Sequence, residues 1–161
     1  MENSLEQSIN AQRSLLNKML ETELRRHARG LAGCMDRPEQ LDHCLRKVFL
    51  ALDYCKYVFV VDADAVQISS TINRYGADTE SLGRDRSERP YMQHRQDGQR
   101  DFNLSEAYIS RNKKRPSITA IQTIHHENGE IRGYLGVDFD LRDLPVSDVI
   151  YEESSKWRQI K

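Results

Sequence analysis

The sequence predicts an α+β fold in which two helices precede one antiparallel sheet. Apolar residues recur at helical spacing over residues 4–31 and again over residues 36–55. Runs rich in β-branched residues then surround two turn sequences, DADA at 62–65 and ENGE at 127–130. Helices that come first and hairpins that follow are typical of helices packed on an antiparallel sheet. A length of 161 residues fits one domain.

Residues 4–31 are predicted to form a long amphipathic helix that ends near Gly30 and Gly33. Its apolar stripe consists of Leu5, Ile9, Leu16, Met19, Leu20 and Leu24. A helix of this length with so narrow a stripe is not fully covered by a domain of this size. The pattern therefore favours a partner helix from a second copy, that is, a homodimer through the N-terminal helix. A helix packed only on its own domain is the alternative.

The second helix is predicted to begin at Asp36. Aspartate is a good N-cap, Pro38 suits the first turn, and Glu39 completes a capping box. The apolar positions of this helix are Leu41, Cys44, Leu45, Val48, Phe49 and Leu52.

Two hairpins follow, joined by a long polar segment. Residues 56–72 form the first hairpin around DADA, and residues 117–144 form the second around Asn128-Gly129. Residues 74–116 are predicted to be a long irregular insertion with a short helix near 87–97. Its aromatic residues argue against disorder. Residues 147–161 are expected to form a short helix or a frayed end.

The composition excludes several partners. A net charge of −1 gives no reason to expect nucleic acid. The sequence has no apolar run of 18 residues, and its N-terminus lacks the basic and apolar regions of a secretory signal. These features predict a cytoplasmic protein without a membrane partner. Cys34, Cys44 and Cys55 fit neither a zinc site nor a CxxC motif, so we expect reduced, mostly buried thiols.

No catalytic, metal or cofactor motif is recognisable. The sequence lacks GxSxG, HExxH, P-loop and GxGxxG patterns. His125 and His126 point to opposite faces if they lie on a strand, and Asp62 and Asp64 are explained as turn residues. We therefore predict that the chain is not an enzyme and holds no metal or cofactor. A hydrolase that uses Asp138 with a histidine is the least favoured possibility.

Four segments in the order found here resemble the Cache family of sensor domains, also called PDC, which have a PAS-like fold. They are VFVVDADAVQISST, GRDRSERPYM, FNLSEAYIS and GYLGVDFDL. The resemblance covers about residues 40–145. It implies a PAS-like central sheet on which the long helix and the long loop pack. It also implies a dimerisation and signalling helix at 1–35, a sensor domain at 36–146 and a tail at 147–161.

The resemblance also implies a binding site between the sheet and the long loop. Arg89 matches the arginine that receives a ligand carboxylate, and Tyr91 matches an aromatic wall. Tyr108 would close the pocket, and Asp138 matches the acid that meets a ligand amine in amino-acid-binding members. The remaining loop residues are expected to have other roles: Asp85, Ser87 and Pro90 shape the loop, and Arg84, Arg86 and Glu88 are solvated or help to hold its shape.

Departures from the family pattern bear on the ligand. Amino-acid-binding members carry a tyrosine where this chain has Met92 and an aspartate where it has Ser110. This weakens the case for an amino acid and leaves a small organic acid or an amino-acid-like molecule. Cache domains usually belong to chemoreceptors, histidine kinases or cyclic-di-GMP proteins and usually lie outside the cytoplasm, whereas this sequence shows no membrane segment and no output domain.

Two functions therefore remain open. The first is a dimeric sensory domain for a small carboxylate-bearing metabolite. The second is a ligand-free dimeric scaffold that contacts a separate signalling kinase or cyclic-di-GMP enzyme. In the second case Arg89 would pair with Asp138 or Asp85 of its own chain.

Overall fold

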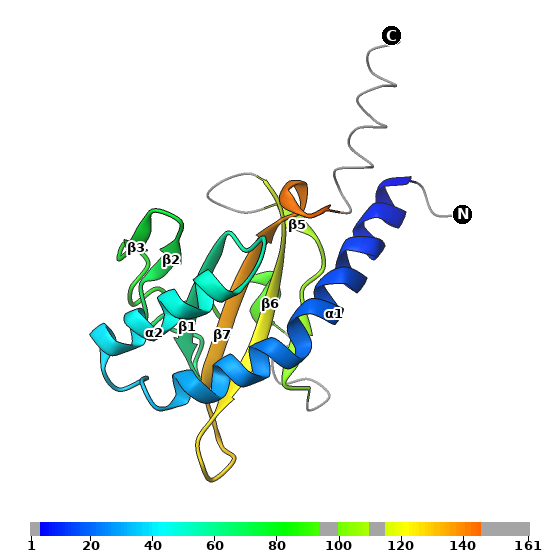
Figure 1. Ribbon diagram of the computed structural model, residues 1–161. Helices are drawn as coiled ribbons and strands as arrows, with labels where there is room; N and C mark the ends of the chain where they lie inside the picture. Colours follow the sequence, from blue (N-terminus) through cyan, green and yellow to red (C-terminus); the bar gives the residue numbers. More distant parts are fainter. Residues whose placement is uncertain (1–3, 94–99, 110–114, 146–161) are drawn as a thin grey trace.

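The computed structural model describes residues 4–93, 100–109 and 115–145 (Figure 1). Within these residues, a seven-stranded antiparallel sheet has the order β3-β2-β1-β7-β6-β4, and β5 pairs with β6. The helices are α1 (Ser4–Ala32) and α2 (Pro38–Ala51), and both lie on the same face of the sheet. The strands are β1 (Tyr57–Asp62), β2 (Thr71–Asn73), β3 (Gly76–Asp78), β4 (Phe102–Leu104), β5 (Tyr108–Ile109), β6 (Pro116–His125) and β7 (Ile131–Asp140). This arrangement confirms the predicted α+β, PAS-like fold. The predicted tail at 147–161 lies outside the described residues, as does Ser110.

The hairpin of β6 and β7 forms the centre of the sheet, and β1 pairs with the other edge of β7. The predicted turn at Asn128-Gly129 is confirmed, with Gly129 at a φ of 90° and the Asn128 side chain accepting a hydrogen bond from Glu130 N. Asparagine followed by glycine suits this turn because glycine adopts positive φ without a steric penalty.

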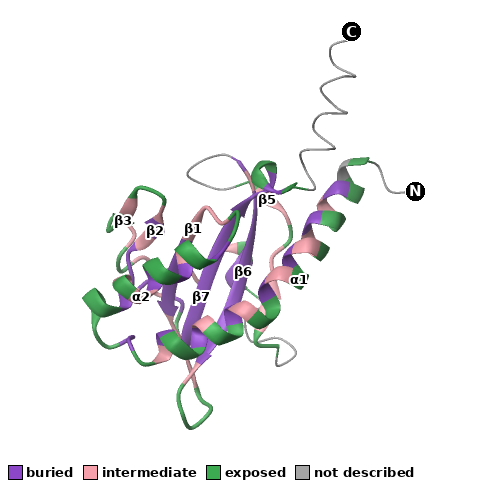
Figure 2. Cartoon of the chain, viewed as in Figure 1, coloured by how far each residue is buried: buried purple, intermediate pink, exposed green. Residues whose placement is uncertain are grey.

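The main core lies between the sheet and the helices, as the buried central strands in Figure 2 indicate. Side chains alternate along a strand, so Leu135, Val137 and Phe139 of β7 face the helices while their neighbours face the opposite side. The described leucines of the α1 stripe, Leu16, Leu20 and Leu24, are fully buried in this core. The stripe therefore packs on its own domain along this stretch.

The N-terminus of α2 differs from the prediction. Arg37, not Asp36, is the N-cap residue, and its side chain makes no capping hydrogen bond. Asp36 instead lies 2.6 Å from the guanidinium of Arg132, at the start of β7. The prediction was wrong because an ion pair from a distant strand competes for the aspartate, which no local pattern reveals.

This uncapped end makes a stability test possible. Arg37 already has the extended backbone of an N-cap, with φ −123° and ψ 98°. An aspartate at this position can accept a hydrogen bond from a free N–H of the first turn. We expect Arg37→Asp to stabilise the chain by about 1 kcal/mol, which corresponds to about 2–4 °C in Tm. Thermal denaturation measures this, and a Tm that is unchanged or lower would contradict it. Arg46→Asp, at an exposed position in the middle of α2, is the control that should give no gain.

The described parts of the segment at 74–116 contain more regular structure than predicted. It contains β3, β4, β5 and a 3₁₀ turn, η1 (Pro90–Met92), where a short helix near 87–97 was expected. Each of these strands has only two or three residues, so the periodicity of the sequence is too short to reveal them. Residues 94–99 lie outside the described part of the chain.

The first hairpin is present, but a long connection joins the end of β1 at Asp62 to the start of β2 at Thr71. Val58 pairs with Ile72, and the DADA turn is stabilised by Asp62, whose carboxylate accepts hydrogen bonds from Asp64 N and Val66 N. Ala65 adopts a φ of 67°, a conformation that usually favours glycine. Asp62 is therefore a turn residue, as predicted.

Two of the cysteines meet where α1 ends and α2 begins. Cys34 Sγ lies 3.0 Å from Cys44 Sγ, and Cys34, Cys44 and Cys55 are all free thiols. Burial raises the pKa of the Cys55 thiol to about 12, so it stays protonated at neutral pH. In the described part of the chain, no helix is both long and apolar enough to cross a membrane.

Candidate functional site

A cavity of about 330 Å³ lies on the face of the sheet opposite the helices. The four residues predicted to bind a ligand, Arg89, Tyr91, Tyr108 and Asp138, all line it. The other lining residues are Tyr57, Phe59, Thr71, Asn73, Asp78, Ser81, Arg86, Pro90, Ile109, Arg115 and Thr119. The site is therefore built by β1, β6 and β7 at the centre of the sheet, by the short strands β2, β3 and β5, and by the loop that contains η1.

The floor of the cavity is a row of three residues across the sheet. Strand pairing places Asp138 of β7 opposite Tyr57 on one side and opposite Thr119 on the other. All three side chains point away from the helices because they occupy the same face of neighbouring strands. The register of β1, β7 and β6 thus creates the polar floor of the cavity.

Asp138 is held by two partners. Arg115 donates to its Oδ2 atom over 2.5 Å, and the Thr119 hydroxyl donates to its Oδ1 atom over 3.1 Å. Asp138 and Arg115 are only 8% and 5% exposed, so this is a buried ion pair. Burial raises the pKa of the Asp138 carboxyl, while Arg115 and the hydrogen bond from Thr119 act in the opposite direction.

The hydrogen bonds continue to Tyr108. Its hydroxyl lies 2.6 Å from Thr119 Oγ1. Because Thr119 has one hydroxyl proton and gives it to Asp138, the Tyr108 hydroxyl must donate to Thr119. Burial raises the pKa of Tyr108, so it remains a neutral donor. The Tyr108 oxygen keeps acceptor capacity at the cavity wall.

Arg89 and Tyr91 enter the cavity from the opposite wall. Arg89 caps η1 with extended backbone, and its N–H donates to Arg86 O over 3.0 Å. Tyr91 is buried, with its ring 5.8 Å from Phe59 and 6.1 Å from Tyr108 between ring centroids. Burial raises the pKa of Tyr91. The three rings form an aromatic wall over the polar floor.

Arg86 also lines the cavity, so treating it only as a loop residue was incomplete. Its guanidinium donates to Gln67 Oε1 over 2.6 Å and to the Tyr91 hydroxyl over 2.7 Å. It also lies over the Phe59 ring, 4.4 Å from the centroid. Arg86 therefore fixes the aromatic wall and adds positive charge to the site.

The residues assigned to loop shape make local contacts. Asp85 Oδ1 accepts a hydrogen bond from Ser87 N over 2.8 Å, and Pro90 is the first residue of η1. An aspartate that binds the backbone two residues ahead is a turn-forming contact. This geometry fits the task predicted for these residues.

Sequence reasoning missed Arg115, which supplies the partner of Asp138. Arg115 directly precedes β6, and its guanidinium lies 5.1 Å from the centroid of the Tyr57 ring. The only signal was its place one residue before a buried strand, which many surface arginines share. Thr119 was also missed, although two-residue alternation from Ser117 places it on the cavity face.

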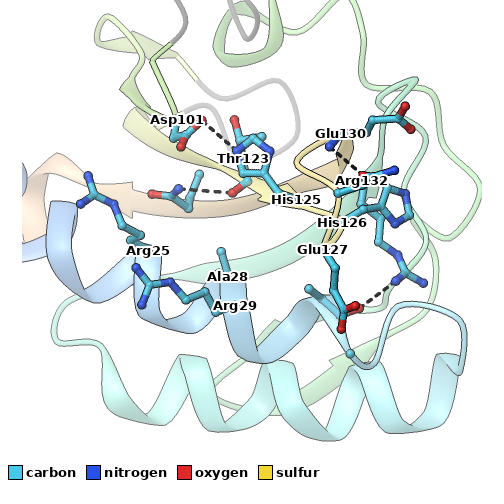
Figure 3. Close-up of a pocket in the computed structure, with 14 residues that line it drawn as sticks. Arg25, Ala28, Arg29, Asp101, Thr123, His125, His126, Glu127, Glu130 and Arg132 are labelled. Atoms are coloured by element: carbon cyan, nitrogen blue, oxygen red, sulfur yellow. Dashed lines mark hydrogen bonds and ion pairs between the residues drawn. The ribbon is translucent and has the colours of Figure 1, made fainter.

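A second, more open hollow of about 990 Å³ lies between α1 and the end of the β6–β7 hairpin (Figure 3). Arg25 and Arg29 of α1 lie on one side of it, and the hairpin residues lie on the other. Several of its charged groups pair with one another or with backbone. His125 contacts Asp101, and Arg132 donates to Ala32 O. The cavity opposite the helices, with its buried polar floor, is the better candidate for a small-molecule site.

Solved structures with a similar fold include three sensor domains. An extracellular ligand-binding receptor from Desulfohalobium retbaense has a TM-score of 0.59 and 16% identity, over 89% of this chain and 26% of that one. The extracellular domain of a protein described as a histidine kinase, vpHK1S-Z8, has a TM-score of 0.61 and 17% identity, over 86% and 55% of the two chains. The ligand-binding domain of the Pseudomonas fluorescens chemoreceptor CtaA, in complex with L-alanine, has a TM-score of 0.59 and 20% identity, over 84% and 56%.

No family model and no curated protein matches the chain. The chain spans about a quarter of the receptor and about half of the other two structures. The predicted cytoplasmic location is wrong by this comparison, because the receptor and kinase structures are described as extracellular. At these identities the comparison establishes the fold, which is that of the ligand-binding sensor domains of chemoreceptors and histidine kinases.

Proposed function

We propose that the chain is a Cache-type sensory domain that binds a small carboxylate-bearing molecule between the sheet and η1. The observation that carries this proposal is the cavity itself, where Arg86, Arg89 and Arg115 face a space enclosed by aromatic rings. Its volume of about 330 Å³ lies at the small end of the usual range for ligand sites. The similarity to CtaA, solved with L-alanine, supports a small ligand of this kind.

The proposed chemistry follows from the side chains. Arg89 offers a planar guanidinium that can form two parallel hydrogen bonds with a carboxylate and keeps its charge when partly buried. Tyr91, Phe59 and Tyr108 would cover the apolar part of the ligand. We place the domain outside the cytoplasm, in line with the extracellular domains that share its fold.

The test is ligand-induced thermal stabilisation of Arg89→Ala. A panel of small organic acids and amino acids should raise the Tm of the wild type for at least one compound. Arg89→Ala should reduce affinity for that compound at least tenfold, because a charged hydrogen bond to a carboxylate is worth about 1.5–3 kcal/mol. Arg84→Ala, in the same loop but not lining the cavity, is the matched control and should respond as the wild type does. Equal responses of wild type and Arg89→Ala to every compound would refute this role.

Dimerisation through α1 stays a prediction, as does a kinase or cyclic-di-GMP enzyme as partner. The alternative scaffold function needs no ligand, and in it Arg89 pairs with Asp138 or Asp85. Asp138 is held by Arg115 and Thr119, which argues against the first of these two pairings, whereas the pairing with Asp85 stays a prediction. A stable signalling enzyme recovered with the chain, together with no response to any small molecule, would favour the scaffold.

A further inference from the structure

We propose that Arg115 determines the ligand class of the cavity. By binding Asp138 from within the chain, Arg115 takes the position that a ligand ammonium group would need. The cavity then selects organic acids that lack an α-amino group. This inference rests on the proposed function and narrows its ligand.

The first support is the shortage of carboxylates that could pair with an ammonium group. Among the described residues that line the cavity, the carboxylates are Asp78 and Asp138. Both oxygens of Asp138 are engaged, one by Arg115 and the other by Thr119. Asp78 is exposed and accepts a hydrogen bond from Glu80 N. An ammonium group, which must be paired when it is buried, would find no free carboxylate on the floor.

The second support is the way in which Arg115 is fixed. Its guanidinium is buried, lies over the Tyr57 ring, and has Asp140 Oδ2 3.9 Å away in addition to Asp138. A ligand amine would have to displace this guanidinium from two carboxylates and an aromatic ring. Arg115 already supplies the positive charge that Asp138 requires, without the entropy loss of bringing in a separate cation.

The test uses probe pairs that differ only in the α-amino group: propanoate with L-alanine, and pentanoate with L-norvaline. Calorimetry and thermal shift are measured for wild type and for Arg115→Gln. The wild type should bind the acid of at least one pair at least tenfold more tightly than the amino acid. Arg115→Gln removes the internal cation and exposes the Asp138 carboxylate, so affinity for the amino acid should rise at least tenfold.

Two further variants give the matched controls. Arg115→Gln combined with Asp138→Asn should lose the gained affinity, since neither charge remains, and Arg115→Lys should keep the wild-type preference. A wild type that binds the amino acid as tightly as the acid overturns the inference. A folded Arg115→Gln chain without any gain also overturns it. If that variant is too unstable to assay, the inference is tested on the wild type alone. A wild type that responds to neither propanoate nor pentanoate is then evidence against the inference.

Failure of the proposed function would look different. In that case the wild type would prefer the acid and Arg115→Gln would gain affinity for the amino acid, but Arg89→Ala would bind every probe as the wild type does. A wild type that needs Arg89 but accepts L-alanine and propanoate equally would refute the role of Arg115 alone.

Discussion

Replacing Gly133 with alanine is expected to destabilise the chain by about 3 kcal/mol or more. Gly133 lies in β7 at the centre of the sheet, and a Cβ atom there would stand 2.3 Å from the Val61 carbonyl oxygen of β1. It would also stand 2.8 Å from Met35 Cε. A side chain can turn away, but a backbone oxygen within a paired strand cannot move without breaking the β1–β7 ladder. Urea denaturation monitored by circular dichroism measures the loss.

A second glycine-to-alanine substitution is the control, and it is expected to raise the stability of the chain. A Cβ at Gly30 meets nothing within 4 Å, and Gly30 lies in the last turns of α1. Alanine has the higher helix propensity, so Gly30→Ala should stabilise by about 0.5–1 kcal/mol. A Gly133→Ala chain as stable as the wild type would show that β1 and β7 are not paired in this register.

Arg115→Gln is expected to cost about 3–5 kcal/mol at pH 7, because it leaves the Asp138 carboxylate buried without its cation. Burial already raises the Asp138 pKa above its usual 3.8, and removing Arg115 raises it further. Below pH 3.8 the carboxyl is protonated in both the folded and the unfolded state. As the pH rises from 3.8 through the raised folded pKa, the unfolded state loses its proton first, so the folded state loses stability. The cost of Arg115→Gln should therefore shrink as the pH falls from 7 toward 4.

The control is the neutral pair Arg115→Gln with Asp138→Asn. It removes both charges and should recover much of the lost stability, with a weaker dependence on pH between 4 and 7. Denaturation midpoints measured between pH 4 and 7 give the stability of both the single and the double variant. A cost for Arg115→Gln that does not change with pH would mean that Asp138 keeps its charge by another route.

The fold was predictable because its main elements are long and periodic. The stripe along α1, the β-branched run of β1 and the Asn128-Gly129 turn each identified an element that the structure contains. The short strands β3, β4 and β5 were missed because two or three residues do not establish a period. The N-terminus of α2 was placed one residue early because Arg132, 96 positions beyond Asp36 in the sequence, pairs with the expected cap.

The candidate site was only partly predictable. The resemblance to Cache domains supplied Arg89, Tyr91, Tyr108 and Asp138, and these residues do line one cavity. The partner of Asp138 depends on strand register, which the sequence does not reveal. Pairing the residues of β6 and β7 by counting outward from the hairpin turn gives the wrong partner for Asp138. The reason is an irregularity at Ile124 and His125, which shifts the pairing by one residue. This shifted register places Thr119 directly opposite Asp138, and Arg115 precedes the same strand.

The alternation of side chains along β7 has a consequence for signalling. Asp138 lies on the floor of the cavity, while its direct neighbours Val137 and Phe139 pack in the core beneath the helices. Beyond them, the Leu141 carbonyl accepts a hydrogen bond from Gln12 of α1. In the proposed sensory function, a ligand that displaces Asp138 on one face of the sheet would also shift Val137 and Phe139 on the other face. The hydrogen bond from Gln12 to Leu141 joins the residue that follows β7 to α1, so the strand would carry that shift to the helix.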